Sequence, residues 1–182
     1  MLIARPMGRH ELDRSSKGKT FDISTDGQSI GRVTDKGAIT LNDRNYTVTG
    51  GGMTSPGARE TLSLLKGGHL PKLTWRPYVL TDAHGKMVAK SERANSRAFA
   101  VSHDGDAFRF ARGGWLSSTW YLYPREGDAP LGSIAKQGWF GGTCTVEMPD
   151  TVGKLLQVFL FWQRLRWEID YQSEGSSYVS TS

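Results

Sequence analysis

The chain has 182 residues, which suits a single domain large enough to fold without disulfides or metal ions. Its 22 glycines, six Trp, six Tyr and seven Phe are typical of short strands joined by tight turns, and they exclude a collagen, a coiled coil and a disordered chain. The net charge of +5 permits an anionic partner such as a lipid headgroup, nucleic acid or an acidic protein, although solubility alone accounts for it equally well.

Residues 1–18 are polar and basic without clear periodicity, so we expect a flexible basic N-terminal arm. Residues 19–171 are then the folded domain, and residues 172–182 a serine-rich tail. Cys144 is the one cysteine, so no disulfide can form within the chain. Because no apolar leader precedes the domain, we expect a cytoplasmic protein, with attachment to a membrane surface as the alternative.

One pattern recurs along the first three quarters of the chain: two short segments of alternating apolar residues flank a turn rich in Asp and Gly. This pattern is typical of antiparallel hairpins. It predicts hairpins at residues 21–33, 38–48, 78–89 and 99–110, and residues 121–136 follow the same order. The units are unequally spaced, which favours a β-meander over a solenoid or propeller.

The C-terminal part breaks this pattern and predicts a helix over residues 151–167, with Asp150 or Thr151 as its N-cap. Apolar residues lie nearly all round the predicted helix, so it has to be enclosed by other elements. Its uninterrupted apolar stretch runs only from 155 to 163, shorter than the roughly 20 residues of a membrane span. We therefore expect a sheet curled around a buried helix.

Three segments near the C-terminus resemble the phospholipid scramblase and LURP-one-related proteins, which share the Tubby C-terminal-like fold. They are Leu-Gly-Ser-Ile-Ala-Lys at 131–136, Cys-Thr-Val-Glu-Met-Pro at 144–149, and the apolar helix that ends at Glu-Ile-Asp, residues 168–170. The resemblance implies a mostly β protein, a closed antiparallel barrel of about 12 strands around a buried hydrophobic C-terminal helix. Tubby-type domains bind phosphoinositides through Lys and Arg groups on the barrel.

The chain also departs from the scramblases. It has neither their Pro-rich N-terminal extension nor their cysteine cluster, and their acidic segment before the helix is reduced to Glu147 and Asp150. Two carboxylates are too few for the six to eight oxygen ligands of Ca²⁺. Scrambling activity is therefore not expected to carry over, and we predict no metal and no cofactor.

No group of residues predicts catalysis, so we do not expect an enzyme. The histidines are scattered and lack metal-ligand spacing: His10, His69, His84 and His103. Cys144 is expected to be a buried structural thiol, and Asp104 and Asp106 to belong to a turn. Gly18-Lys19-Thr20 ends like a nucleotide-binding loop, but Asp13 stands where that loop requires a glycine.

Basic residues on adjacent predicted hairpins are the best candidates for a binding surface, because Lys and Arg bind phosphates through charge-assisted hydrogen bonds. The candidates are Lys86, Lys90, Arg93, Arg97, Arg109 and Arg112. Four aromatic residues follow, and they either fill the core or form an aromatic rim: Trp115, Trp120, Tyr121 and Tyr123.

These residues suggest a non-enzymatic module that recognises anionic phospholipid or phosphoinositide headgroups at a membrane surface. Two alternatives stay open: a protein-interaction scaffold without a lipid ligand, and, ranked lower, nucleic-acid binding through the basic face. The same cations can also be simple solvated charges, partly neutralised by Glu92, Asp104 and Asp106. We expect a monomer.

Overall fold

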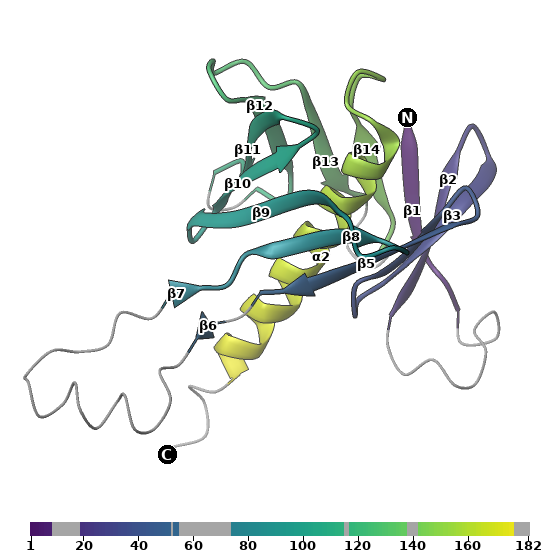
Figure 1. Ribbon diagram of the computed structural model, residues 1–182, viewed down its shortest axis with the longest axis horizontal. Helices are drawn as coiled ribbons and strands as arrows, with labels where there is room; N and C mark the ends of the chain where they lie inside the picture. The colour runs from purple at the N-terminus through teal and green to yellow at the C-terminus, as the bar shows by residue number, and fades with distance from the viewer. Residues whose placement is uncertain (9–18, 52, 55–73, 115–116, 138–141, 177–182) are drawn as a thin grey trace, which may run out of the picture.

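A computed structural model describes residues 1–8, 19–51, 53–54, 74–114, 117–137 and 142–176 (Figure 1). The strands and the helix in these residues are β1 (Leu2–Pro6), β2 (Thr20–Thr25), β3 (Gln28–Thr34), β4 (Ala38–Leu41), β5 (Arg44–Gly50), β6 (Met53–Thr54), β7 (Thr74–Trp75), β8 (Tyr78–Asp82), β9 (Met87–Asn95), β10 (Ala98–His103), β11 (Asp106–Arg112), β12 (Trp120–Pro124), β13 (Gly132–Lys136), β14 (Cys144–Glu147) and α2 (Lys154–Ser176).

Twelve of the described strands close into one antiparallel barrel, which confirms the predicted fold class. Around the barrel they follow the order β1-β14-β13-β12-β11-β10-β9-β8-β5-β4-β3-β2, so most neighbours in space are also neighbours in sequence. The short strands β6 and β7 lie between β5 and β8 in the sequence. They pair with each other in a separate two-stranded sheet, while β5 and β8 pair directly in the barrel. In Figure 1 the yellow helix α2 runs through the ring of strands.

The predicted hairpins at residues 21–33, 38–48, 78–89 and 99–110 are all present. Three of their turns place both central residues at positive φ, namely Asp26-Gly27, Asn42-Asp43 and Asp104-Gly105. Such turns match the twist of the flanking strands, and Asn, Asp and Gly are the residues that adopt positive φ most readily. Local turn chemistry thus explains why the chain reverses at these points.

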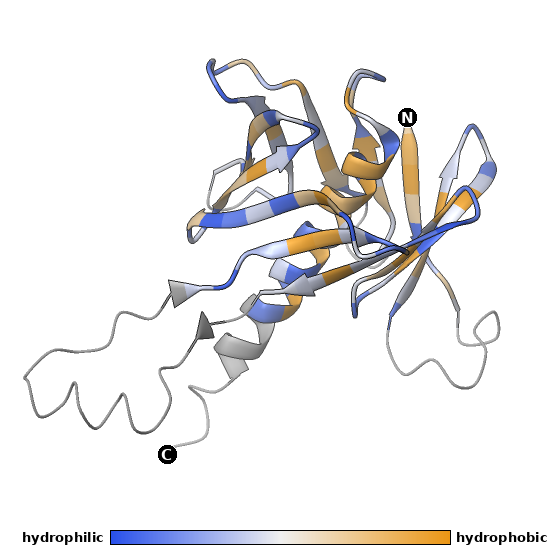
Figure 2. Cartoon of the chain, viewed as in Figure 1, coloured by the Kyte–Doolittle hydropathy of each residue, from blue (hydrophilic) through white to orange (hydrophobic). Residues whose placement is uncertain are grey.

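The helix α2 fills the centre of the barrel. Leu156, Val158, Phe159, Phe161 and Trp162 lie on different sides of it, and each is at most 4% exposed. Figure 2 shows that the strands of the barrel wall carry hydrophobic and hydrophilic residues mixed along their length. The prediction of an enclosed helix is therefore confirmed. None of the helical segments in the described residues is long and apolar enough to cross a bilayer.

The first strand corrects the prediction of an arm over residues 1–18. Leu2–Pro6 forms β1, which pairs with both β2 and β14 and so closes the barrel. Leu2 and Ala4 are 3% and 1% exposed, because their alternation directs both side chains into the core. The barrel thus begins before residue 19, and residues 9–18 lie outside the described part of the chain.

Both ends of the helix also differ from the prediction. Neither Asp150 nor Thr151 is the N-cap, since the Val152 amide first closes a turn on the Pro149 carbonyl and the helix begins at Lys154. Val152 itself is buried in the core, at 3% exposed. At the other end α2 continues to Ser176, past the predicted start of the tail at 172. Two ion pairs with i,i+4 spacing, Arg164–Glu168 and Arg166–Asp170, support the turns that precede this extension.

Candidate functional site

Strand alternation divides the six predicted basic residues between the two faces of the barrel wall. Lys90 and Arg93 are three positions apart on β9, and so are Arg109 and Arg112 on β11. An odd separation along a strand puts two side chains on opposite faces. Lys90 and Arg109 lie on the outer face, whereas Arg93 stacks on Trp75 of β7 and Arg112 on Trp167 of α2.

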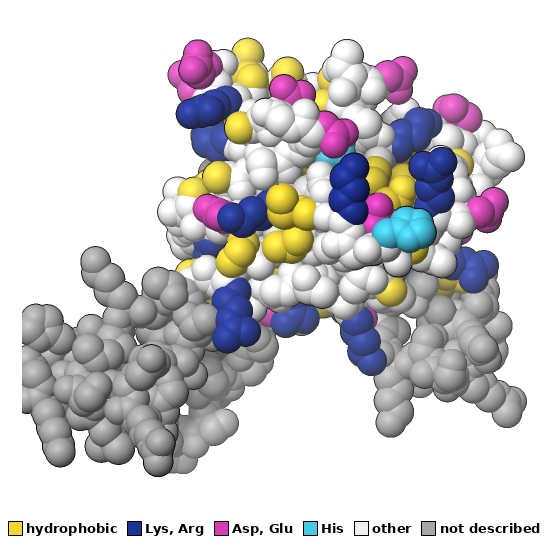
Figure 3. All heavy atoms as spheres, viewed as in Figure 1, with side chains coloured by type: hydrophobic (Ala, Val, Ile, Leu, Met, Phe, Trp, Pro, Cys, Tyr) yellow, Lys and Arg dark blue, Asp and Glu magenta, His cyan; other side chains and the backbone are white. Residues whose placement is uncertain are grey.

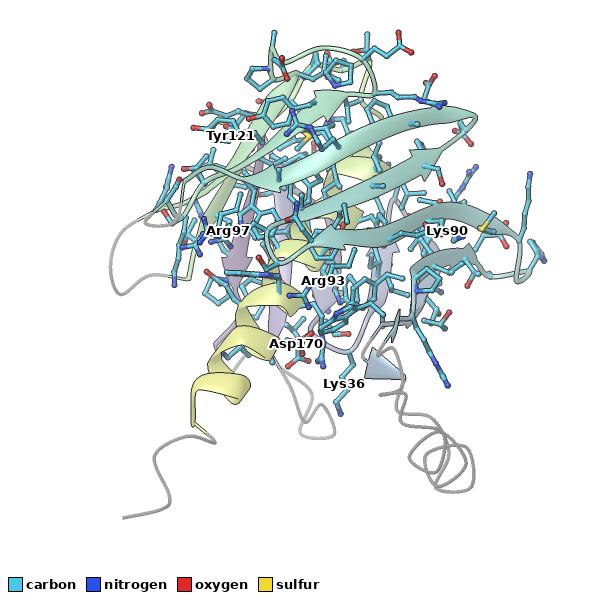
Figure 4. All side chains as sticks on the ribbon, turned by 90° about the vertical axis from the view of Figure 1, so that its left-hand side faces the viewer. Lys36, Lys90, Arg93, Arg97, Tyr121 and Asp170 are labelled. Carbon is cyan, nitrogen blue, oxygen red and sulfur yellow. The ribbon has the colours of Figure 1, made fainter. Side chains whose placement is uncertain are left out.

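The other two candidates, Lys86 and Arg97, lie at opposite ends of β9. Lys86 precedes the strand, and Arg97 follows it in the turn to β10. A strand from Met87 to Asn95 is about 30 Å long, so these two cations cannot bind the same headgroup. Figure 4 likewise shows Lys90 and Arg97 far apart, toward opposite ends of these strands, with Arg93 near Asp170 of α2. The six residues do not form one cationic face.

The register of the barrel creates a shallow hollow on the outer face of β9, β10 and β11. Glu92 and Arg109 are both cross-strand partners of Ala100, one from each neighbouring strand. Ser102 lies in the same way between Lys90 and Ala107. The central strand β10 therefore contributes only small side chains to the outer surface, while larger charged side chains stand on both sides of it.

We call this hollow the outer groove. Its volume is about 420 Å³, and it is lined by Lys90, Glu92, Ala94, Phe99, Ala100, Val101, Ser102, Ala107, Phe108, Arg109 and Arg125. The lining is therefore mainly apolar, with three cations and one carboxylate. Such a surface can receive a ligand that is both anionic and partly apolar.

Ion pairs and an aromatic ring position the cations of the outer groove. The Lys90 ammonium lies 2.5 Å from a carboxylate oxygen of Glu92, and the Arg109 guanidinium lies 3.6 Å from Asp128. Arg109 also stacks over the ring of Tyr123, 4.1 Å from its centroid. This stacking restrains the guanidinium plane while its N–H groups stay accessible, since half of the side chain is exposed (48%).

The inward-facing arginines help to close the end of the barrel where α2 emerges. Arg93 lies 3.9 Å from the ring centroid of Trp75, and Arg112 lies 5.0 Å from that of Trp167. The Trp167 indole donates to the Ser96 carbonyl at 3.0 Å. The cavity beside Arg93 and Trp75 measures about 20 Å³, enough for a water molecule but not for a headgroup. These contacts indicate a structural role.

Tyr78 and Asp170 join the wall to the helix at the same end of the barrel. The Tyr78 hydroxyl donates to an Asp170 oxygen at 3.4 Å, and Arg166 binds another oxygen of that carboxylate at 2.8 Å. Burial, reinforced by the negative charge of Asp170, raises the pKa of Tyr78 above its ordinary value. The phenol therefore stays neutral and is not a candidate base.

Cys144 lies inside the barrel and is 2% exposed, as expected of a structural thiol. Its sulfur accepts a hydrogen bond from the buried Arg164 guanidinium at 3.1 Å, and Arg164 also pairs with Glu168 at 3.0 Å. Burial raises the pKa of the Cys144 thiol above its ordinary value, although the charge of Arg164 acts in the opposite direction. A protonated, enclosed thiol is a poor nucleophile.

Those of the remaining predicted residues that the structure describes do not form a reactive group. His84 is exposed in the β8–β9 turn, and His103, only 15% exposed at its side chain, contacts the Val88 carbonyl and Asp104. Asp82 accepts amide hydrogen bonds from Lys86 and His84, which lower its pKa. Within the described residues no three potential ligands are grouped for a metal ion. His10, His69, Asp13, Gly18 and Trp115 lie outside those residues.

The aromatic residues divide in the same way as the cations. Trp120 is 1% exposed and stacks with Phe110 in the core, whereas Tyr121 and Tyr123 alternate onto the outer face. Trp120 therefore belongs to the core, whereas Tyr121 and Tyr123 do not. Sequence reasoning missed Arg125, which follows β12 and reaches the outer groove. The signal available was its position two residues after the outward-facing Tyr123.

Two larger hollows carry less positive charge. One, of about 510 Å³, has the charged residues Arg44, Asp43 and Asp82 in its lining, and the other, of about 580 Å³, has Arg32 and Asp43. Of these three hollows, only the outer groove has more cations than carboxylates. In Figure 3 the basic side chains on the visible face are interspersed with acidic and hydrophobic ones, so no broad basic patch competes with it there.

Comparison with known proteins adds no assignment. The chain matches no protein-family model, no curated protein and no solved structure.

Proposed function

We propose that the protein is a non-enzymatic module that binds anionic phospholipid headgroups at a membrane surface through the outer groove. The observation that carries this proposal is the apolar floor beside Ala100 with Lys90, Arg109 and Arg125 around it. A phosphate can bind these cations while the glycerol and first methylenes of the lipid cover the small side chains. A fold of the Tubby C-terminal type, and kinship with the scramblase and LURP-one-related proteins, form part of the same proposal.

The composition of the groove favours a lipid over nucleic acid. Nucleic-acid surfaces are rich in positive charge and bind phosphates spaced along a strand. The outer groove combines only three cations with a carboxylate, and most of its lining is apolar. Its size also suits a single headgroup, because small-molecule sites typically occupy about 300–1,000 Å³. A protein partner would use the same surface without dependence on an anionic lipid.

Co-sedimentation with vesicles at two salt concentrations tests the proposal. Neutral phosphatidylcholine vesicles are compared with vesicles that also contain an anionic phospholipid. The test variant combines Lys90→Gln, Arg109→Gln and Arg125→Gln. Each cation near an anionic membrane contributes about 1 kcal/mol, so we expect the variant to bind roughly a hundredfold more weakly.

A matched control removes the same charge from other parts of the chain, with Arg5→Gln, Arg32→Gln and Lys36→Gln. All three residues are exposed, and β1 and β3, which carry the first two, flank the strand opposite β10 in the twelve-membered ring. Screening over about 8 Å should limit their effect on the groove. Equal losses in the two variants, or equal wild-type binding to neutral vesicles, would contradict the proposal. Full competition by soluble glycerol 3-phosphate would instead assign the groove to a free phosphate compound.

A further inference from the structure

The outer groove has a charged end and an apolar end. Its cross-strand rows succeed one another along β10, so that the row through Ser102 lies nearest the β10–β11 turn and the row through Ala100 comes next. The charged residues of the lining lie at these two rows: Lys90, Glu92, Arg109 and, directly after the β12 partner of Phe108, Arg125. Further along the outer face of β9 the lining continues with Ala94, which is exposed. The groove thus leads from a cationic end to an end whose described lining is apolar.

The groove is also narrow, because a single strand forms its floor. Strands β9 and β11 flank β10, so their backbones lie about 10 Å apart. Carbon atoms in contact are about 4 Å apart, so one alkyl chain between two walls needs about 8 Å, and two chains side by side need about 12 Å. Beside Ala100 the side chains of Glu92 and Arg109 form those walls. The groove therefore has room for one chain.

We propose that the outer groove binds an amphiphile with one phosphate and a single alkyl chain, such as a lysophospholipid. This inference rests on the proposed function, since it names the class of anionic lipid that fills the same groove. The phosphate binds at the charged end, where three cations outnumber the one carboxylate. The chain then lies along β10, over Ala100 and towards Ala94, where small apolar side chains form the floor.

Contact with this floor should strengthen binding with each added methylene. Full burial of one methylene corresponds to about fourfold in affinity. The floor covers the chain from one side only, so we expect about twofold per methylene. Lys90 and Ala94 are four positions apart on β9, so the gain should continue for a chain about 13 Å long.

A series of alkyl phosphates tests the proposal without vesicles. NMR titration of the wild-type protein measures the dissociation constants of ethyl, butyl, hexyl and octyl phosphate, each kept monomeric. The phosphate is the same throughout, so a trend in affinity reports the chain. We expect affinity to rise about sixtyfold from ethyl to octyl phosphate, with the largest amide shifts at Ala94 and Ala100.

A branched isomer tests whether the groove admits only one chain. Octan-4-yl phosphate has the same charge and the same number of carbon atoms as octyl phosphate, but it divides them between two shorter arms. Since one arm fits over Ala100 and the other stays in water, we expect the branched isomer to bind about tenfold more weakly. Equal affinity of the two isomers would overturn the single-chain inference.

The variant Ala94→Gln/Ala100→Gln fills the floor and leaves the three cations in place. It should bind ethyl phosphate within about twofold of wild type and lose most of the gain with chain length. The matched control, Ala38→Gln/Ala83→Gln, makes the same changes at exposed positions outside the groove and should keep that gain. Thermal unfolding of each variant confirms that its fold is intact.

The remaining outcomes separate this inference from the proposed function. An equal gain in wild type and in Ala94→Gln/Ala100→Gln would place the chain elsewhere, and affinity independent of chain length would leave only the phosphate in the groove. Either result overturns the inference and leaves the proposed function intact. Failure of every alkyl phosphate to bind, while anionic vesicles still bind, does the same. Absence of binding to alkyl phosphates and anionic vesicles alike would overturn both.

Discussion

The two faces of strands β9 to β12 carry the same kinds of residue with different consequences. On the inner face, Arg93 and Arg112 stack on tryptophans beside the exit of α2. On the outer face, Lys90 and Arg109 stand around a hollow with an apolar floor. A shift of one residue along a strand decides between these environments. Position on the strand, rather than residue type, therefore separates stabilising cations from candidate binding cations.

The largest expected effect is a loss of stability when a buried residue of the helix α2 is replaced. Phe159 is fully buried, so Phe159→Ala should lower the free energy of unfolding by about 3–5 kcal/mol through lost burial and a new cavity. Phe159→Asp should prevent folding. Chemical denaturation measures the first change and circular dichroism the second. Met87→Ala, at a residue 58% exposed, is the control and should leave stability nearly unchanged. A folded, stable Phe159→Asp variant would show that α2 is not central.

A smaller effect is expected from single substitutions that compare the inner and outer faces directly. Arg93→Ala should lower the free energy of unfolding by about 1 kcal/mol, because it removes the stacking on Trp75 and the cover of the side-chain stem. Binding to anionic vesicles should hardly change. Lys90→Ala should do the reverse, with stability within about 0.5 kcal/mol of wild type and weaker vesicle binding. The same assays on both variants test the division, and it fails if Arg93→Ala weakens binding as much as Lys90→Ala.

The smallest expected effect is a loss of folding stability in alkaline solution, caused by the buried thiol of Cys144. Burial raises the pKa of Cys144, so the folded protein holds the thiol proton more tightly than the unfolded chain does. The corresponding stability is fully present below the unfolded pKa of about 8.5, and it declines as the pH rises towards the folded value. The loss at pH 9 should stay below about 1 kcal/mol.

Denaturation of the wild-type protein and of Cys144→Ala between pH 7 and pH 9, a range set around the thiol pKa of about 8.5, measures this contribution as a difference in slope. The wild-type protein should lose stability more steeply, because only its unfolded state gains a thiolate. Tyr78 acts in the same direction at higher pH, but it is present in both proteins and cancels in the comparison. Parallel pH profiles would show that the thiol is not shielded as the structure indicates.

The candidate site could be predicted only in part. The alternation of β9 and β11 was already sufficient to separate Lys90 from Arg93 and Arg109 from Arg112. Arg125 was harder to predict, because it lies in a connection after β12 and reaches the groove across the barrel surface. The cross-strand neighbours of Ala100 depend on register, which a β-bulge between β9 and β10 changes at Phe99.

By itself the sequence determined the local structure and much of the fold class. Asp and Gly at the turns, alternation in the strands and apolar residues all round one helix led to antiparallel hairpins around an enclosed helix, because each of these signals acts over a few residues. Only the tertiary structure decided that Leu2–Pro6 closes the barrel and that Glu92, Ala100 and Arg109 form one row. Closure and register depend on contacts between segments far apart in the chain, and no local pattern contains them.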